Sequence, residues 1–133
     1  MPVKQVIVIR KDLKMRRGKE IAQGAHASMK VILNYLDYKR TINNGNTPVY
    51  ELEVTSSISE WLDGIFTKVV VYVESEEELL SVYEKAKEAG LPCSLIKDRG
   101  LTEFHNVPTY TCVGIGPDES SKIDKITGNL SLY

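Results

Sequence analysis

The order of short β-branched runs and longer helical patterns is the feature that most limits how this chain can fold. Residues 3–9, "VKQVIVI", and residues 67–75, "TKVVVYVES", are typical of buried strands because β-branched side chains dominate them. A third run, "PCSLIKD", ends at Asp98, and a fourth, "TYTCVGIG", covers residues 109–116. We therefore expect four core strands, with helical patterns following the first and the second.

The helical pattern after the first strand runs over residues 17–38 and carries two stripes. One stripe is apolar and is expected to be the buried face: Ile21, Ala25, Met29, Ile32 and Leu36. The other is polar and steps by four, three and four: Lys19, Gln23, His26 and Lys30. Two interpretations of the polar stripe stay open. It is either a plain solvent face or, beside the donors of a helix N-terminus, a site for a phosphate or a developing oxyanion.

The later elements complete an α/β pattern. Ser75 and Glu78 match a capping box for a helix that ends near Gly90, and residues 117–128 predict a short last helix. Crossovers through helices favour parallel strand pairs, whereas the shorter loop between the third and fourth strands allows an antiparallel one. The predicted fold is an α/β, three-layer α/β/α sandwich with a mixed, mostly parallel four-stranded sheet.

Residues 39–60 interrupt this pattern. The segment "NNGNTP" is a strong turn signal, "VYELEV" alternates like a hairpin strand, and "SISEWLDGIF" suggests a short helix capped by Ser57 or Ser59. A chain of 133 residues fits one domain. We therefore expect a single domain over residues 1–133, with residues 39–60 as a surface excursion or lid.

Charge is distributed unevenly along the chain. Residues 1–40 contain ten Lys and Arg against three Asp and Glu, and the remainder contains seven against fifteen. The net charge of −1 therefore conceals a basic first part. Such a part can hold a polyanion on an otherwise acidic body, or it can be a solvated charge run.

Several classes of protein are disfavoured. No apolar run approaches the roughly 20 residues of a membrane helix, and the first apolar run is too short for a signal peptide. The two cysteines form no CxxC pair, which favours free thiols in a cytosolic protein. Two distant histidines make a weak metal site, "GIGP" lacks the rest of a dinucleotide fingerprint, and the chain has no P-loop.

Chemistry is expected where loops leave the carboxyl ends of strands. The loop after the first strand is basic, and the loop after the third starts at Asp98 and contains Thr102. A carboxylate beside lysines is expected to ionise and can orient or deprotonate a water molecule. The alternative is that Asp98 and Thr102 only cap the loop.

Several motifs occur in an order that resembles one family. "VIVIRKDLKMRRGKEIAQGAHAS" is similar to the N-terminal signature of the class II, archaeal and eukaryotic type, peptidyl-tRNA hydrolases. "SEEELLSVYEKAKEAGLP", "DRGLTEF", "PTYTCVGIGP" and "IDKITGNLSL" resemble the family's later motifs. The resemblance covers roughly residues 3–37 and 67–132.

The resemblance implies hydrolysis of the ester that joins a peptide to the 3′ end of tRNA, which recycles stalled peptidyl-tRNA in ribosome rescue. It implies tRNA as the partner, no metal and no other cofactor, a cytoplasmic location without membrane contact, and frequently a homodimer. The open alternatives are an RNA-binding module without hydrolysis, a hydrolase of another acyl ester, and a protein-interaction domain with an acidic working surface.

Site residues carry over position by position. Lys14 and Lys19 match the motif lysines, and His26 matches the motif histidine. Asp98 and Thr102 match the D-x-G-x-T motif, and Thr109 and Thr111 match T-x-T. The predicted catalytic residues are Lys19, His26, Asp98, Thr102 and Thr109. The predicted tRNA-binding residues are Lys11, Lys14, Arg16, Arg17, Lys30 and Thr111. The sequence departs from the family pattern at Arg16, at Pro108 and in the longer 39–60 segment.

Overall fold

A mixed four-stranded sheet forms the centre of the protein in a computed structural model, which describes residues 2–101 and 103–133. Its strands are β1 (Val3–Arg10), β4 (Lys68–Val73), β5 (Cys93–Asp98) and β6 (Thr109–Glu119), in the spatial order β4-β1-β6-β5. The α/β class and the mixed sheet are therefore confirmed. The expectation of a mostly parallel sheet is wrong, because only the β1–β4 pair is parallel and β6 runs antiparallel to both its neighbours. This difference has two causes. No helix connects β5 to β6, so these two strands run antiparallel, and β6 lies between β5 and β1 and runs antiparallel to β1 as well.

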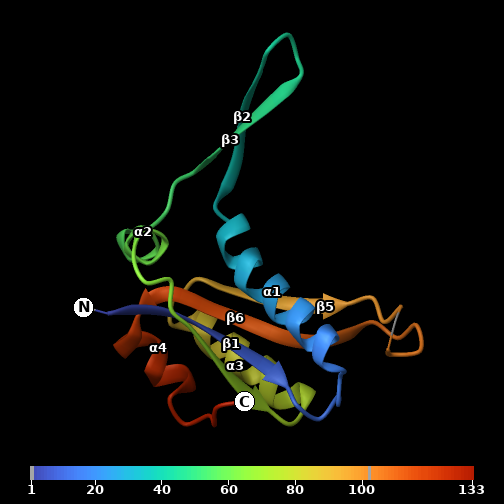
Figure 1. Cartoon of the computed structure of the whole chain (residues 1–133). Coiled ribbons are helices and arrows are strands. Elements are labelled where there is room, and N and C mark those ends of the chain that lie inside the picture. The colour runs from blue at the N-terminus through green and yellow to red at the C-terminus, as the bar shows by residue number, and fades with distance from the viewer. Residues whose placement is uncertain (1, 102) are drawn as a thin grey trace.

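Helices cover both faces of the sheet (Figure 1). Helix α1 (Arg17–Leu33) lies on one face, and α3 (Glu76–Glu88) and α4 (Ser120–Thr127) lie on the other. The larger core cluster lies between the sheet and the α3–α4 layer: Val6, Val8, Val71, Val73, Leu79, Val82, Ala86, Leu91, Val113, Ile115 and Ile123. Helix α3 begins as expected, since the Ser75 side chain accepts a hydrogen bond from the Glu78 N–H at 3.1 Å.

Helix α1 packs on the sheet through a face that the sequence did not indicate. Its buried residues are Gln23, Ala27 and Val31, whereas Ile21 is 67% exposed and Met29 is 61% exposed. The predicted buried stripe is therefore wrong. The reason is close packing through small residues, since Gly114 of β6 lies directly under the Ala27 carbonyl. The bulkier apolar stripe is left facing outward.

Replacing Gly114 by alanine is expected to destabilise the fold. A Cβ at this position would lie 2.5 Å from the Ala27 carbonyl oxygen, so α1 would have to move away from the sheet. Overpacking of this kind costs about 1–3 kcal/mol in the free energy of unfolding, which urea denaturation measures. Gly18→Ala is the control, because nothing lies within 4 Å of the added Cβ. Equal stability of the two variants would contradict this account of α1 packing.

The segment after α1 leaves the body of the protein. Helix α1 ends at Leu33 and not near residue 38, and strands β2 (Leu36–Ile42) and β3 (Thr47–Leu52) then form a separate antiparallel hairpin (Figure 1). Helix α2 (Ser56–Asp63) follows, with Thr55 as its cap in place of the predicted Ser57 or Ser59. Trp61 anchors α2, because the buried indole donates to the Thr67 carbonyl at 2.8 Å.

No helix in the described part of the chain combines the length and the apolar character that a membrane span requires.

Candidate active site

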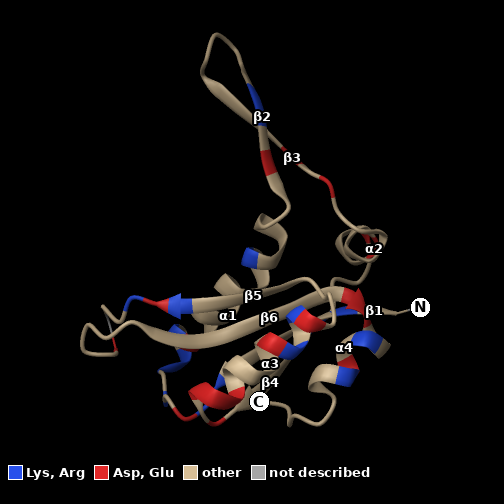
Figure 2. Ribbon diagram, turned by 180° about the vertical axis from the view of Figure 1, so that it is seen from behind, with Lys and Arg blue, Asp and Glu red and all other residues tan. Residues whose placement is uncertain are grey.

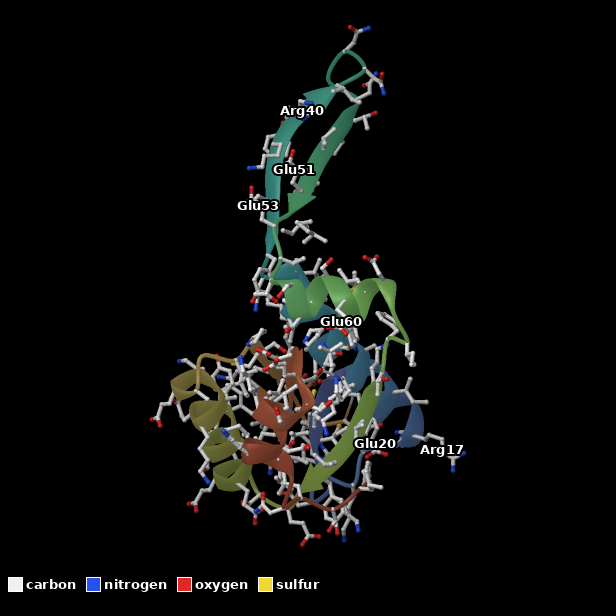
Figure 3. All side chains as sticks on the ribbon, turned by 90° about the vertical axis from the view of Figure 1, so that its left-hand side faces the viewer. Arg17, Glu20, Arg40, Glu51, Glu53 and Glu60 are labelled. Atoms are coloured by element: carbon white, nitrogen blue, oxygen red, sulfur yellow. The ribbon has the colours of Figure 1, made fainter. Side chains whose placement is uncertain are left out.

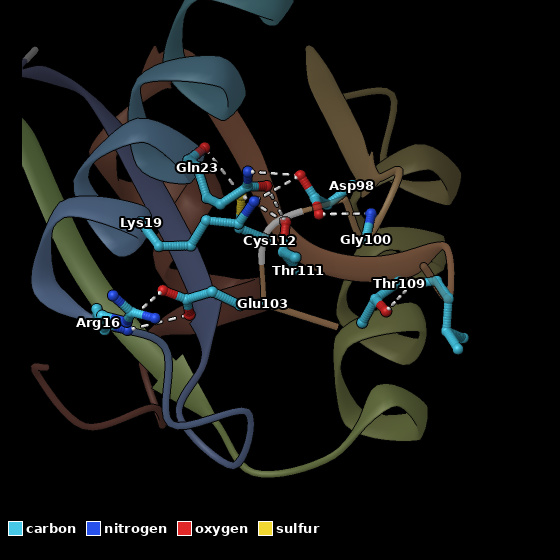
Figure 4. Close-up of polar contacts among 10 residues, drawn as sticks. Arg16, Lys19, Gln23, Asp98, Gly100, Glu103, Thr109, Thr111 and Cys112 are labelled. Carbon is cyan, nitrogen blue, oxygen red and sulfur yellow. Dashed lines mark hydrogen bonds and ion pairs between the residues drawn. The ribbon is translucent and has the colours of Figure 1, made fainter. Parts of the chain in front are cut away.

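Asp98 is the centre of a polar cluster at the end of β5 (Figure 4). Its Oδ1 accepts hydrogen bonds from Lys19 Nζ at 2.9 Å and from Gln23 Nε2 at 3.2 Å. Its Oδ2 accepts from the backbone N–H of Gly100 at 2.8 Å. Three donors from α1 and from the loop after β5 thus hold the carboxylate in one orientation.

Gln23 connects this carboxylate to the core. Its side chain is 1% exposed, and its Oε1 accepts a hydrogen bond from the Thr111 hydroxyl at 2.5 Å. The Gln23 backbone carbonyl also accepts from the Cys112 thiol at 3.1 Å. Because Thr111 occupies the amide oxygen, the amide nitrogen is directed at Asp98.

A β-bulge explains why two consecutive residues of β6 reach the same helix. Ile96 pairs with Cys112 but Lys97 pairs with Tyr110, so Thr111 is the extra residue on β6. A bulge of this kind re-aims side chains and is common beside active sites. A regular strand would place Thr111 and Cys112 on opposite faces, whereas the bulge lets both of them contact Gln23.

The environment favours the ionised form of Asp98. Partial burial acts to raise the pKa of the carboxyl, but the hydrogen bonds from Lys19, Gly100 and Gln23 and the charge of Lys19 outweigh it and hold the pKa below its ordinary value. The side chains of Lys19 and Asp98 are 14% and 15% exposed, so this ion pair is largely shielded from solvent. At neutral pH Asp98 is therefore an ionised carboxylate, held in one orientation beside Lys19.

Gln23→Met is expected to raise the pKa of Asp98 toward its ordinary value, because the ionised form loses one donor. The acid limb of any activity that needs the carboxylate should then move to higher pH. The Thr111 hydroxyl also loses its acceptor, at a cost of about 1–3 kcal/mol in the free energy of unfolding. NMR titration of the Asp98 carboxyl measures the shift. Thr109→Val is the control, since the Thr109 hydroxyl donates to Val107, and an unmoved Asp98 pKa in both variants would contradict this role of Gln23.

The cluster opens into a cleft of about 350 Å³ between α1 and the end of β5. Lys19, Gln23 and His26 form one wall, and the other consists of Ile96, Lys97, Asp98, Arg99 and Leu101. Both walls therefore bear cations, and Figure 2 shows Lys and Arg at the end of β5 and along the segment that enters α1. The cleft suits an anionic ligand whose reacting group can reach Asp98 and Lys19.

The loop after Asp98 is attached to the start of α1. Glu103 accepts a hydrogen bond from the backbone N–H of Arg16 at 3.3 Å and forms an ion pair with its guanidinium at 3.2 Å. Lys19 Nζ lies 5.6 Å from the centre of the Phe104 ring. These contacts hold the loop over the first turn of α1. Within residues 2–101 and 103–133, no three His, Cys, Asp or Glu side chains gather in a way that could hold a metal ion.

Comparison with known proteins assigns this chain to a family. The family model described as "Peptidyl-tRNA hydrolase PTH2" matches residues 3–133. The chain belongs to the PTH2 family. A protein named peptidyl-tRNA hydrolase from Methanocaldococcus jannaschii is 45% identical over 98% of this chain and 99% of its own length. Proteins of the same name from Methanopyrus kandleri and Sulfurisphaera tokodaii are 43% and 42% identical, over 97% and 99% of this chain and the same shares of their own lengths. The resemblance drawn from the sequence motifs is thus confirmed.

The structure brings together part of the set of catalytic residues that the resemblance in the sequence implied. Lys19 and Asp98 are in contact, and His26 lines the same cleft with an exposed side chain. Thr109 is opposite Asp98 in the strand register, but its hydroxyl is bonded to the Val107 carbonyl at 2.8 Å. Thr102 lies outside the described residues.

The residues predicted to bind tRNA divide into two groups. Thr111 is fully buried beneath Gln23, which removes it from any surface that tRNA can touch. The basic side chains are all exposed: Lys11, Lys14, Arg16, Arg17 and Lys30. Lys11 lies 4.5 Å from the centre of the Tyr72 ring, and Arg17 borders a separate apolar groove on the other side of α1.

Sequence reasoning missed several members of the site. The spacing of four predicted that Gln23 shares a helix face with Lys19, but it gave Gln23 no role in the site. The Asp-x-Gly spacing at residues 98–100 is a turn signal that could have suggested the Gly100 amide. No local pattern indicates the pairing of Arg16 with Glu103, which is set by tertiary structure alone.

Proposed function

We propose that the cleft around Asp98 hydrolyses the ester between a peptide and the 3′ end of tRNA. The observation that carries the proposal is the Lys19–Asp98 pair, which places an ammonium and an ionised carboxylate side by side in a basic cleft. Membership of the PTH2 family supports this choice of substrate. The same proposal includes a cytoplasmic location, where translation takes place, and pairing of two copies of the chain.

In the proposed reaction, water attacks the ester carbonyl carbon, the bond from that carbon to the ribose 3′ oxygen breaks, and a proton from the water ends on the leaving 3′ oxygen. A carboxylate with a lowered pKa is a weak proton acceptor, so Asp98 orients the attacking water and holds the Lys19 side chain in place. Lys19 stabilises the oxyanion of the tetrahedral intermediate. Gln23, held by Thr111, positions Asp98, and His26 contacts the bound substrate at the rim of the cleft.

The exposed basic side chains at the start of α1 are proposed to hold tRNA phosphates: Lys11, Lys14, Arg16 and Arg17. Lys30 lies on the polar stripe nearer the C-terminal end of α1 and extends this surface along the helix. Lys97 and Arg99 add two cations on the opposite wall of the cleft. Phosphate contacts of this kind fix the orientation of the nucleic acid, and the Asp98 cluster then meets the ester.

Salt dependence is expected to report these contacts. Replacing Lys14 and Arg17 together by alanine should weaken tRNA binding and lower the slope of log Kd against log salt by about 2, because each phosphate contact contributes roughly one. Fluorescence anisotropy with labelled tRNA measures both quantities. Lys85→Ala on α3, the opposite layer of the fold, is the control. An unchanged slope in the double variant would remove these residues from the interface.

The function itself is tested with two substrates. The purified protein is incubated with N-blocked aminoacyl-tRNA and, separately, with free aminoacyl-tRNA. Release of the amino acid from the blocked form alone supports the proposal. Binding without cleavage would instead indicate an RNA-binding module, and cleavage of simple acyl esters without tRNA preference would indicate a different hydrolase.

A further inference from the structure

Among the described residues that line it, the cleft around Asp98 offers a single carboxylate, whose acceptor positions are almost all occupied. Oδ1 of Asp98 accepts from Lys19 and Gln23, and Oδ2 accepts from the Gly100 N–H. A carboxylate has about four lone-pair positions, and the attacking water of the proposed reaction takes the remaining one. A cationic group beside the ester would therefore have to displace that water.

Other acidic side chains near this cleft are directed elsewhere. Glu103, on the loop after Asp98, forms an ion pair with Arg16 at 3.2 Å. Glu20 lies on the first turns of α1, but its carboxylate accepts a hydrogen bond from the Tyr133 hydroxyl on the opposite, groove side of the helix. Three further carboxylates lie on the β2–β3 hairpin and on α2, away from the start of α1 that Arg17 marks in Figure 3: Glu51, Glu53 and Glu60.

Basic side chains outnumber the one carboxylate, and Arg99 is the one whose charge is not engaged elsewhere in the described part of the chain. Lys19 is paired with Asp98 at 2.9 Å. Lys97 Nζ lies 4.9 Å from the centre of the Tyr110 ring, which packs against the core on the α3 side of the sheet. Arg99 lines the cleft, is exposed, and has no ion-pair partner among the described residues. Its guanidinium is always charged, so it leaves an uncompensated positive charge beside the carboxylate.

The turn that carries Arg99 is held on both sides. Asp98, before it, makes three hydrogen bonds through its side chain. Gly100, after it, is buried with a φ of +81°, and its carbonyl accepts from the Asn106 N–H at 2.8 Å. The Val107 carbonyl lies so close to Gly100 that a side chain would not fit there. The backbone of Arg99 is therefore fixed directly next to the group that is proposed to meet the ester.

Acyl groups on the same tRNA differ in charge at the α-carbon, which is bonded to the ester carbonyl. An unblocked amino acid carries an ammonium there at any pH below its α-amino pKa of about 8. A peptidyl or N-blocked group carries a neutral amide, and an α-hydroxy acid carries a neutral hydroxyl. At an effective dielectric constant near 20, repulsion between two like charges about 6 Å apart disfavours binding about 100-fold. The cleft thus disfavours the ammonium through its charge, whatever the size of the group.

We propose that the cleft selects substrates by the charge at the α-carbon and that Arg99 is a specificity-determining residue. Any neutral α-substituent is admitted, so the protein also hydrolyses α-hydroxyacyl-tRNA. In that reaction water adds to the ester carbonyl carbon, the bond to the ribose 3′ oxygen breaks, and a proton from the water ends on this oxygen. The products are the α-hydroxy acid and tRNA. This selection rests on the proposed hydrolysis and goes beyond it, because an α-hydroxy acid has no blocking group.

Three substrates on one tRNA test the proposal at pH 6: N-acetylphenylalanyl-tRNA, phenylalanyl-tRNA and phenyllactyl-tRNA. The last replaces the ammonium of phenylalanyl-tRNA by a hydroxyl of nearly the same size. The wild-type protein is expected to cleave phenyllactyl-tRNA with a kcat/KM within about 10-fold of that for the N-acetyl substrate, and phenylalanyl-tRNA about 100-fold more slowly. If phenyllactyl-tRNA were as inert as phenylalanyl-tRNA, the site would recognise the amide of the blocking group, and charge selection would be overturned.

Arg99→Glu tests the residue itself. It reverses one charge beside the ester and should lower the ratio of kcat/KM for N-acetylphenylalanyl-tRNA over phenylalanyl-tRNA about 10-fold or more, with Arg99→Gln lowering it less. A lost tRNA contact cancels in this ratio, because both substrates carry the same tRNA. Lys97→Glu is the matched control, since the same charge reversal two residues earlier lies on the Tyr110 side of the sheet and should leave the ratio unchanged. Circular dichroism confirms that each variant is folded.

The outcomes separate charge selection from the proposed hydrolysis. A wild-type protein that cleaves none of the three substrates would overturn both. Cleavage of the N-acetyl substrate together with inert phenyllactyl-tRNA, or with equally rapid cleavage of phenylalanyl-tRNA, would overturn charge selection alone. An unchanged ratio in Arg99→Glu, or an equal fall of the ratio in Lys97→Glu, would overturn the assignment to Arg99.

Discussion

Asp98→Asn should lower kcat/KM for N-blocked aminoacyl-tRNA by about 100-fold or more, without loss of the fold. The substitution keeps the shape of the side chain but removes the charge that holds Lys19 Nζ at 2.9 Å. It also replaces one acceptor oxygen by a donor, so the amide cannot accept from Lys19, Gln23 and Gly100 together. Single-turnover hydrolysis and circular dichroism measure the two quantities.

Glu103→Gln is the matched control for this experiment. Glu103 is a second carboxylate on the same loop and is also ion-paired, but to Arg16 at the edge of the site. We expect it to change kcat/KM by only a few-fold. A folded Asp98→Asn protein with near-wild-type turnover would sink the assignment of Asp98 to the reaction.

Lys19→Met should reduce kcat by about 100- to 1,000-fold, the usual loss when one donor to an oxyanion is removed. The methionine preserves much of the length of the side chain, so the wall of the cleft stays filled. Lys19→Arg keeps a positive charge in a different shape and should recover only part of the rate. Rapid-quench kinetics on bound N-blocked aminoacyl-tRNA separates the chemical step from binding.

The division between kcat and KM decides the role of Lys19. Lys30→Met is the control, since Lys30 is an exposed lysine on the same stripe of α1. It should affect tRNA affinity more than the chemical step. If Lys19→Met raised KM and left kcat unchanged, Lys19 would hold a phosphate and would not stabilise the transition state.

Local patterns predicted the elements of the fold better than their packing. β-branched runs located the four core strands because these strands are buried and leave a continuous apolar signal. Periodicity also located α1, but it could not show which face meets the sheet. The choice depends on Gly114, a residue almost ninety positions away that allows only small side chains above it. The outward stripe of larger residues then looks like a core face although it is not one.

The residues of the site could be predicted where their position along the chain and their side-chain chemistry indicated the same role. Lys19 and Asp98 could be proposed from their positions after two strands and from the family motifs, and the structure places them in contact. Thr111 shows the limit of such reasoning. The family resemblance predicted that it binds tRNA, but the bulge opposite Ile96 and Lys97 turns it into the core, where it fixes Gln23. A bulge depends on the pairing of two strands and has no reliable signal in either one.

The three faces of α1 make the length of this helix critical. One face packs on β6, a second borders the Asp98 cleft and a third lines the apolar groove. Inserting a single residue between Lys19 and Met29 would rotate the following part of the helix by about 100°. That change would turn each face toward the wrong neighbour and would re-aim the β2–β3 hairpin at the helix end. Related chains should therefore vary in length after Leu33, where the segment leading into the hairpin begins, and keep the spacing within α1 fixed.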